Sequence, residues 1–350
     1  MINLYELDRA GLENLLKEWG QPAFRANQVW EWVFTKRAQS FDEMTNLPKA
    51  LRERLTAETR LGVLEVAAEQ SSKDGTVKRL YKLADGQLIE SVLMPYDDDR
   101  RTACISTQAG CAMGCVFCAT GQMGFARHLT AAEIFEQAMR YSRLLESEGD
   151  RLSNIVLMGM GEPFHNYDAT VAAIRRLMDE LGIGARHITV STVGLVPQIK
   201  RFADEGLQVR LAISLHAATD EERSALLPVN KRWPLAELIA TCHEYIKKTG
   251  RRVTFEWTAI AGQNDTLEQA HPLGNLLRGM LCHVNIIPLN PTGGYGGDPA
   301  VFDRINRFVA TLTEYGVQAT VRVRRGIDIA AGCGQLKSTV LRPEKIPVVE

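Results

Sequence analysis

From about residue 100 onward, short apolar runs alternate with longer amphipathic stretches. The runs have the length and β-branched content of buried strands, and the stretches carry apolar residues at helical spacing. The expected strands are 103–106, 154–158, 187–191, 209–215, 253–260, 283–289 and 318–323. The expected helices are 131–145, 170–181, 197–205, 235–248, 267–279 and 301–315. Six consecutive strand–helix units predict parallel strands with helices outside, in either a barrel or a doubly wound sheet.

Two smaller segments precede this alternation. Leu12, Leu15 and Trp19 fall at helical spacing, so a small helical domain is expected at the N-terminus. Three alternating stretches separated by Asp-Gly turns then predict a short antiparallel β extension. These stretches are 61–67, 77–83 and 88–94. We therefore expect three segments. Residues 1–60 form the helical domain, residues 61–98 form the β extension, and residues 99–342 form the barrel with its C-terminal cysteine loop.

The composition is that of an ordinary globular protein. Of the 350 residues, 45% are hydrophobic and 24% are charged, and no uncharged apolar run reaches the ~18 residues that span a bilayer. The acidic, amphipathic N-terminus resembles neither a signal nor a transit peptide, so we expect a cytoplasmic protein whose thiols stay reduced. A net charge of −1 argues against a surface covered in positive charge, but it allows a local nucleic-acid patch.

Three cysteines follow the first strand of the expected barrel. Cys111, Cys115 and Cys118 have the spacing CxxxCxxC, and no fourth cysteine lies close on their C-terminal side. Three thiolates on one loop can hold three corners of a cubic iron–sulfur cluster, which ordinarily takes four. The missing ligand would leave one iron open, as a substrate-binding or catalytic metal requires. The spacing therefore predicts one 4Fe-4S cluster.

Two other interpretations of these cysteines stay open. A disulfide between two of these cysteines would leave the third without a partner. Disulfides are also typical of small secreted domains rather than of a 350-residue chain. A structural zinc ion would need a fourth ligand, which His128 could supply.

The second strand is followed by Gly159, Gly161 and Glu162. The two glycines resemble the start of a dinucleotide-binding turn, but position 164 is Phe164, and the third glycine of that motif is needed for helix–strand packing. No phosphate-binding GxxxxGK[ST] loop occurs in the sequence. We expect these glycines instead to let the backbone approach a small ligand closely.

Small polar side chains follow the third, fourth and sixth strands. They are Ser191, Ser214, His216 and Asn290. Because parallel strands share one C-terminal edge, we expect these side chains to converge on one mouth of the barrel. Each one alone would more often cap a strand end. Together, beside a metal loop, they indicate a polar ligand with ribose, amino and carboxylate groups.

Two further cysteines lie outside the motif. Cys104 is in the first barrel strand, and Cys333 follows the last strand in a glycine-rich loop. A buried, inert thiol is the usual role of a cysteine, and we assign it to Cys242 and Cys282, which have apolar neighbours. The glycines beside Cys333 predict an accessible loop with a reactive thiol.

These motifs together resemble a known family. The three-cysteine spacing, the Gly-Glu pair and the expected barrel are similar to those of the radical S-adenosylmethionine (radical SAM) enzymes. Within that group, the chain resembles the RlmN/Cfr family of RNA methyltransferases, and its adenine-C2 enzymes in particular. The stretches that carry this likeness are 22–26, 43–48, 101–106, 117–121, 158–163 and 333–336. The resemblance implies an α/β fold with a partial (βα)6 TIM-type barrel and an RNA-contacting N-terminal domain.

The resemblance also implies a two-stage methylation that uses two S-adenosyl-L-methionine (SAM) molecules per turnover. One SAM methylates Cys333, and the second binds the open iron of the cluster and is cleaved reductively to a 5′-deoxyadenosyl radical. That radical takes hydrogen from the S-methyl group, and the resulting methylene radical adds to adenine C2. Cys104 then resolves the RNA–protein link by forming a transient disulfide with Cys333.

Further roles carry over residue by residue. The SAM contacts of the family correspond here to Gly161, Glu162, Ser191, Ser214, Leu215, His216 and Asn290. Glu90 matches the position proposed in the family as a proton acceptor, and the alternative for it is a solvent-facing strand residue.

The resemblance implies two RNA partners. They are 23S ribosomal RNA, at an adenine of the peptidyl-transferase centre, and tRNA, at the adenine 3′ of the anticodon. An external reductant of flavodoxin or ferredoxin type is also implied, and we expect a monomer.

Three alternative functions stay open. A Cfr-type enzyme of the same family would methylate adenine C8 instead of C2. A radical SAM activase would use the cluster without RNA, and Cys333 would then be dispensable. An RNA-binding protein with structural zinc would have neither iron nor sulfide.

Overall fold

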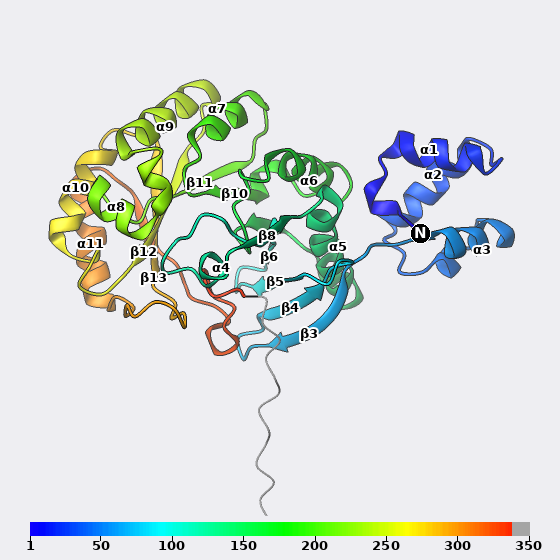
Figure 1. The fold of residues 1–350 in the computed structure, drawn as a ribbon, viewed down its shortest axis with the longest axis horizontal. Helices are drawn as coiled ribbons and strands as arrows, with labels where there is room; N and C mark the ends of the chain where they lie inside the picture. Colours follow the sequence, from blue (N-terminus) through cyan, green and yellow to red (C-terminus); the bar gives the residue numbers. More distant parts are fainter. Residues whose placement is uncertain (338–350) are drawn as a thin grey trace, which may run out of the picture.

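Seven parallel strands form the centre of the molecule in the computed structural model, which describes residues 1–337 (Figure 1). They are β6 (Arg101–Cys104), β9 (Asn154–Leu157), β10 (Ile188–Thr192), β11 (Arg210–Ser214), β12 (Val253–Ala259), β13 (Cys282–Pro288) and β14 (Ala319–Val321). These strands keep the order of the chain across the sheet, and each pairs in parallel with the next. A doubly wound sheet reverses its strand order, so the observed order confirms the predicted α/β partial barrel. Positions 338–342 of the expected barrel segment lie outside the described residues.

Helices cover the outer face of this curved sheet (Figure 1). They are α5 (Ala131–Ser147), α6 (Tyr167–Asp179), α7 (Val196–Asp204), α8 (Asp220–Leu226), α9 (Leu235–Thr249), α10 (Leu267–Leu277) and α11 (Phe302–Glu314). All but α8 were predicted to within a few residues. That helix has only seven residues and begins with three acidic ones, so it shows too little apolar periodicity to be recognised. Thr130 and Glu133 start α5 with a capping box, which satisfies backbone N–H groups at the helix start.

An antiparallel extension continues the sheet beyond β6. It consists of β3 (Glu65–Ser71), β4 (Val77–Lys82) and β5 (Leu88–Pro95), with β5 paired to β6. The second and third strands are confirmed, but the first was predicted at 61–67 and lies four residues later. The amides of Val63 and Leu64 donate to the Glu136 carboxylate on α5, at 2.7 and 3.1 Å, so residues 61–64 lie outside the strand. The observed β3 is an almost fully exposed edge strand, so its sequence lacks the alternation that marks a half-buried strand.

The N-terminal residues form a small helical unit beside the barrel (Figure 1). It contains α1 (Arg9–Glu18), α2 (Phe24–Trp30) and α3 (Lys49–Glu58). The short strand β1 (Ile2–Asn3) pairs with β2 (Thr59–Arg60), so the two ends of the unit meet. The rings of Tyr5 and Phe34 pack against Phe135 on α5 with centroids 5.7 and 6.1 Å away, which joins this unit to the barrel.

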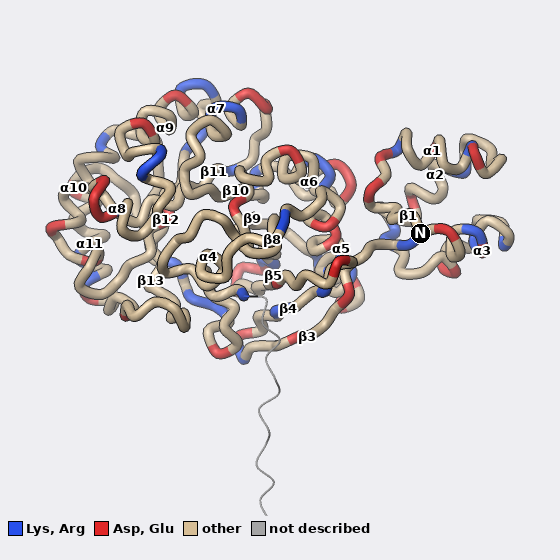
Figure 2. The backbone as a smooth tube through the Cα atoms, viewed as in Figure 1, with Lys and Arg blue, Asp and Glu red and all other residues tan. Residues whose placement is uncertain are grey.

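Charged residues of both signs are interspersed over the molecule (Figure 2). This distribution agrees with the net charge of −1 and leaves room for local basic clusters only. Within residues 1–337, no helix is long and apolar enough to cross a membrane.

Candidate active site

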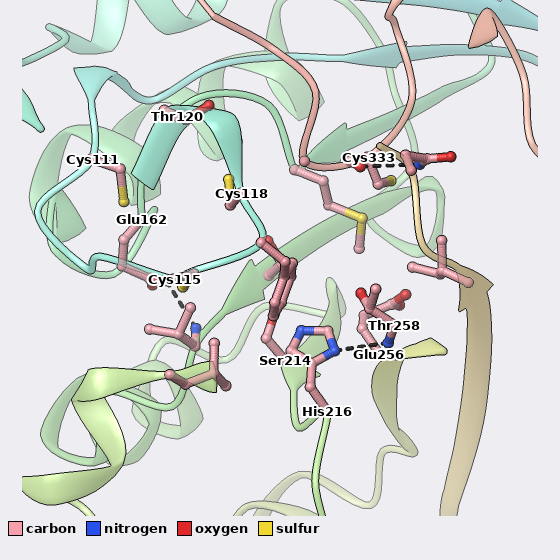
Figure 3. A pocket seen from close by; sticks show the side chains of 18 of the residues that line it. Cys111, Cys115, Cys118, Thr120, Glu162, Ser214, His216, Glu256, Thr258 and Cys333 are labelled. Atoms are coloured by element: carbon pink, nitrogen blue, oxygen red, sulfur yellow. Dashed lines mark hydrogen bonds between the residues drawn. The ribbon is translucent and has the colours of Figure 1, made fainter. Parts of the chain in front are cut away.

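The C-terminal ends of the barrel strands surround a cavity, which is shown in Figure 3. The residues predicted for the site that line it are Cys111, Cys115, Cys118, Gly161, Glu162, Ser191, Ser214, His216, Asn290 and Cys333. Leu215 does not line it and is fully buried. The strand β11 ends at Ser214, and His216 has a left-handed φ of +60°; Ser214 and His216 line the cavity, whereas Leu215 is buried in the core.

A hairpin that the sequence analysis did not predict holds the three cysteines. The strand β7 (Gln108–Gly110) pairs with β8 (Phe125–His128), and the loop between them carries the cysteines and α4 (Ala119–Gln122). The Cys111 amide donates to the Gly124 carbonyl at 2.7 Å, which closes the loop at its base. The Cys118 amide donates to the Cys115 carbonyl at 3.2 Å, so a turn between them brings both side chains to the same cavity.

The three thiols of this loop are shielded from water and line one cavity. Burial raises the pKa of Cys111 to about 12, and burial also raises the pKa values of Cys115 and Cys118. The thiols are therefore protonated at neutral pH, and a metal that binds them must displace protons. Among the described residues, no group of three or more His, Cys, Asp or Glu side chains is spaced to hold a single metal ion. Three thiols spread around one cavity fit a multi-iron cluster better than one zinc ion.

The structure does not form the zinc site that was considered with His128. The Nδ1 atom of His128 meets Gln108 Nε2 at 3.0 Å, and its ring packs against His165 with centroids 4.9 Å apart. His128 is not among the residues that line the cavity. The disulfide alternative is also absent, because all seven cysteines are free thiols.

Glu162 is a buried carboxylate held by backbone amides. One oxygen accepts from the Phe164 amide at 3.0 Å, and the other accepts from the Val193 amide at 2.9 Å. Burial raises the pKa of Glu162 to about 7, although these amides oppose the effect. A cationic ligand in the cavity would favour the ionised form of this carboxylate.

The glycines before Glu162 have a packing role that the sequence analysis did not foresee. A Cβ atom on Gly159 would lie 2.7 Å from the Ile105 carbonyl oxygen. One on Gly161, whose φ is +101°, would lie 2.6 Å from Gln108 Cβ. Both residues do line the cavity, as expected, but they must be glycine because the strand and hairpin behind them come so close.

His216 is a neutral hydrogen-bond donor. Its Nδ1 accepts from the Thr258 amide at 2.9 Å, so the ring proton must be on Nε2 (Figure 3). Burial lowers the pKa of His216 to about 3, which keeps the ring neutral at physiological pH. The edge of the ring packs against Phe117 in the cysteine loop, with centroids 4.9 Å apart.

Asn290 connects the cavity to the Cys333 loop. Its Nδ2 donates to the Cys333 carbonyl at 3.0 Å, whereas its buried Oδ1 has no hydrogen-bond partner among residues 1–337. Buried polar atoms are rarely left unpaired, so this oxygen fits a donor on a bound ligand. The hydroxyl and amino groups expected of SAM are such donors.

Cys333 also lines a second, smaller cavity together with Cys104. Cys104 lies on β6 with 7% of its surface exposed, and burial raises the pKa of its thiol to about 12. In Figure 3 the three loop cysteines lie on one side of the main cavity and Cys333 on the other. Cys333 thus belongs both to the cavity that the cysteine loop lines and to the cavity that Cys104 lines.

Glu90 lines neither cavity. It is only 4% exposed, so the solvent-facing alternative is wrong. One carboxylate oxygen lies 3.2 Å from Lys78 Nζ, and the other accepts from the Lys337 amide at 2.9 Å. Burial raises the pKa of Glu90, and the Lys78 ammonium opposes this shift.

Two charged residues of the cavity were missed. Glu256 is buried on β12, where Asn285 Nδ2 donates to it at 2.8 Å, and burial raises its pKa. Arg322 lines both cavities, although the sequence analysis gave its region no role in the site. The signal for Glu256 was a single acid inside an otherwise apolar strand, which is unusual unless the acid has a partner.

Comparison with known proteins gives two matching family models. Residues 2–61 match the ribosomal RNA large subunit methyltransferase N-terminal domain. Residues 105–271 match the radical SAM superfamily. The second match contains the three cysteines and all the predicted SAM contacts except Asn290.

Full-length relatives extend these matches. The chain is 54% identical over 343 residues to dual-specificity RNA methyltransferase RlmN 1 of Myxococcus xanthus, covering 97% of this chain and 95% of the relative. It is 46% identical over 346 residues to the probable dual-specificity RNA methyltransferase RlmN of Halalkalibacterium halodurans, covering 98% and 95%. A crystal structure of a radical SAM methyltransferase from Sphaerobacter thermophilus superposes with a TM-score of 0.93 at 50% identity, covering 97% of this chain and all of that one.

Proposed function

The chain belongs to the RlmN family of radical SAM RNA methyltransferases, and we propose that it methylates carbon 2 of adenine through a methylated Cys333. The observation that carries this proposal is the position of Cys333. Its side chain lines one cavity with the three loop cysteines and a second cavity with Cys104. One thiol can therefore meet a methyl donor on one side and a resolving thiol on the other.

Membership of the family implies SAM and an iron–sulfur cluster as cofactors. When bound, they supply an activated methyl group and one-electron removal of hydrogen. We assign one 4Fe-4S cluster to Cys111, Cys115 and Cys118, and two SAM molecules to each turnover. The residues proposed to contact SAM are Gly161, Glu162, Ser191, Ser214, Leu215, His216 and Asn290. Glu162 offers a carboxylate, His216 an N–H donor and Asn290 a free acceptor, which suits a ligand with amino, carboxylate and ribose groups.

Cys333 and Cys104 carry the group transfer. The Cys333 thiol would lose its proton, and its sulfur would take the methyl carbon from the sulfonium of SAM, which leaves as a neutral thioether. That carbon would give up one hydrogen atom to the one-electron chemistry that the bound cofactors supply. As it joins adenine C2, the C2 hydrogen would leave as a proton and one electron would return to the cofactors. Cys104, once deprotonated, then attacks the Cys333 sulfur. The S–S bond forms as the C–S bond breaks, and the electron pair of that bond goes to the carbon on C2, which takes up a proton. Two electrons and two protons must then return both cysteines to thiols. An external reductant of flavodoxin or ferredoxin type is proposed as the electron donor of the enzyme.

The substrate class is RNA, in agreement with the family. We propose an adenine of 23S ribosomal RNA in the peptidyl-transferase centre and the adenine 3′ of the anticodon in tRNA. Relatives named dual-specificity RNA methyltransferases support two RNA classes. A base inside folded RNA must be flipped out of its stack to reach a cavity of this kind.

The N-terminal unit is proposed to contact this RNA. Four cation–aromatic pairs lie within it: Arg9 over Trp30 at 5.3 Å, Arg25 over Phe24 at 4.8 Å, Lys36 over Trp32 at 4.1 Å and Arg54 over Trp19 at 4.4 Å. Basic and aromatic groups side by side can bind phosphates and stack on unpaired bases. The proposed segments remain 1–60 for this RNA-contacting unit, 61–98 for the β extension and 99–342 for the barrel, in a monomeric cytoplasmic protein.

The test is anaerobic turnover of the cluster-loaded protein with SAM, reductant and unmodified ribosomal RNA or tRNA. Nucleosides are then compared by mass spectrometry with 2-methyladenosine and 8-methyladenosine standards. The proposal predicts 2-methyladenosine from both RNAs, and none from Cys333→Ala. An 8-methyladenosine product would identify a Cfr-type reaction instead. If the RNA stays unmodified although the cluster of the protein is intact and reducible, the result would favour the radical SAM activase alternative.

A further inference from the structure

A buried ion pair lies at the base of the loop that carries Cys333. Lys78 on β4 and Glu90 on β5 are 5% and 4% exposed, and their charged groups are 3.2 Å apart. Leu80 is the direct partner of Glu90 in the sheet, so Lys78 and Glu90 are diagonal neighbours on one face. A buried lysine is rare without a specific partner, and this pair also has partners outside its own strands.

Those partners are the two stems of the Cys333 loop. Before the cysteine, the Ala330 carbonyl accepts from Lys78 Nζ at 3.3 Å. After it, the Lys337 amide donates to Glu90 at 2.9 Å. The ion pair thus bridges the backbone on both sides of Cys333. Both charged groups are used in this bridge, and neither residue lines the cavity that holds the SAM contacts.

The loop between these stems is held in a strained and specific conformation. Ala330 has a φ of +50°, a left-handed conformation that is unfavourable for a residue other than glycine. Such a residue persists where its surroundings fix it, and Lys78 binds the carbonyl of this same residue. Nearer the cysteine, the Ala119 amide donates to the Gly334 carbonyl at 2.7 Å, which ties the loop to the cysteine motif.

Other contacts from the β extension support the same stem. The Gly326 amide donates to the Asp74 carboxylate at 2.9 Å. Asp328 accepts from the Ser72 hydroxyl at 2.6 Å, although that pair is exposed and therefore weaker. The extension thus holds the loop upstream of Ala330, and the ion pair holds it at Ala330 and Lys337, on either side of Cys333.

We propose that Lys78 and Glu90 form a clamp that sets the position of the Cys333 loop between the two cavities. The β extension is then part of the catalytic apparatus, although it contributes no group to the reacting atoms. Glu90 acts through the loop as a positioning residue, and Lys78 has the same role on the other side of Cys333. This inference rests on the proposed role of Cys333 and replaces proton acceptance as the role of Glu90.

The first experiment measures loop position without RNA. Cluster-loaded protein is equilibrated with reduced and oxidised glutathione. One glutathione disulfide takes two electrons and two protons from Cys104 and Cys333, giving their disulfide and two glutathione thiols. Peptide mapping gives the equilibrium constant. Loss of hydrogen bonds to charged groups in Lys78→Met or Glu90→Gln should lower this constant about tenfold or more. Amide exchange of residues 326–337 should rise in parallel.

Three further variants separate positioning from folding. Lys82→Met removes an exposed lysine from the same strand and should behave as wild type. Lys78→Arg keeps a cation and should restore most of the constant. Lys78→Met/Glu90→Leu leaves no unpaired buried charge, so it should fold even if the single variants do not, and it should still show the lowered constant.

The clamp is overturned if folded Lys78→Met protein has the wild-type equilibrium constant for the Cys104–Cys333 disulfide and the wild-type amide exchange rates in residues 326–337. It is also overturned if Glu90→Gln alone accumulates an RNA–protein adduct while both loop readouts stay unchanged, since that result identifies a proton acceptor. Failure of the wild-type protein to methylate RNA would defeat the proposed function, whereas the glutathione and exchange readouts would still decide the clamp.

Discussion

Replacing Cys104 tests the resolving step, and the structure gives the expected size of the effect. Burial raises the pKa of this thiol from 9.0 to about 12. At pH 7.5 the thiolate fraction is then roughly 3 in 100,000, about a thousandfold less than at an ordinary cysteine. Because the pKa lies far above neutral pH, the thiolate fraction rises tenfold for each pH unit. Resolution of the RNA–protein adduct should therefore speed up about 100-fold between pH 6.5 and pH 8.5.

The assay is a single turnover that is quenched at intervals and separated on a denaturing gel. Wild-type protein should show a short-lived adduct that lasts longest at low pH. Cys104→Ala should hold the adduct at every pH, because no other cysteine lines the second cavity with Cys333 in the described structure. The variant loses one buried atom and should be destabilised by only about 1 kcal/mol.

Cys242→Ala is the matched control. This cysteine is fully buried on α9 and lines neither cavity, so its replacement has a similar packing cost without touching the reaction. The control should turn over normally. Complete turnover by Cys104→Ala, or adduct decay in wild type that does not change with pH, would refute the reasoning.

Three other perturbations have expected results. Cys111→Ser should lose most bound iron and the cluster absorbance, measured by metal analysis, and retention of both would oppose the cluster assignment. Asn290→Leu should weaken SAM binding about tenfold or more, measured by anaerobic calorimetry, because the variant removes the unpaired Oδ1 acceptor of the cavity. Phe135→Ala should lower the free energy of unfolding by about 3–5 kcal/mol in denaturant titration, since its ring joins Tyr5 and Phe34 to the barrel. A loss below about 1 kcal/mol would show that this junction contributes little.

Local sequence patterns predicted the alternation of parallel strands and helices and most of the cavity, and the family resemblance favoured a barrel over a doubly wound sheet. Parallel strands must end at a common edge, so the strand pattern alone was enough to predict that Ser191, Ser214, His216 and Asn290 meet. The spacing of the cysteine motif likewise limited its three thiols to one loop. The cysteine motif could be recognised because its residues are only a few positions apart. The meeting of the strand ends follows from a rule that holds for all barrels of this type.

Contacts between distant segments were not predictable in the same way. Glu90 and Lys337 are 247 positions apart, and only the folded chain shows that one binds the other. The same holds for Cys104 and Cys333, which the resemblance paired but which no local pattern brings together. Leu215 shows the reverse case, since it was carried over from the family but is buried in the core and does not line the cavity.

The central claim is that Cys333 carries the methyl group on its way to RNA. The most direct measurement is mass spectrometry of the Cys333 peptide after the cluster-loaded protein has reacted with SAM and reductant in the absence of RNA, followed by addition of unmodified RNA. The account predicts one methyl group on Cys333, none on Cys104, and loss of that group as methyladenosine forms. Methyladenosine formation while Cys333 stays unmodified throughout would contradict it.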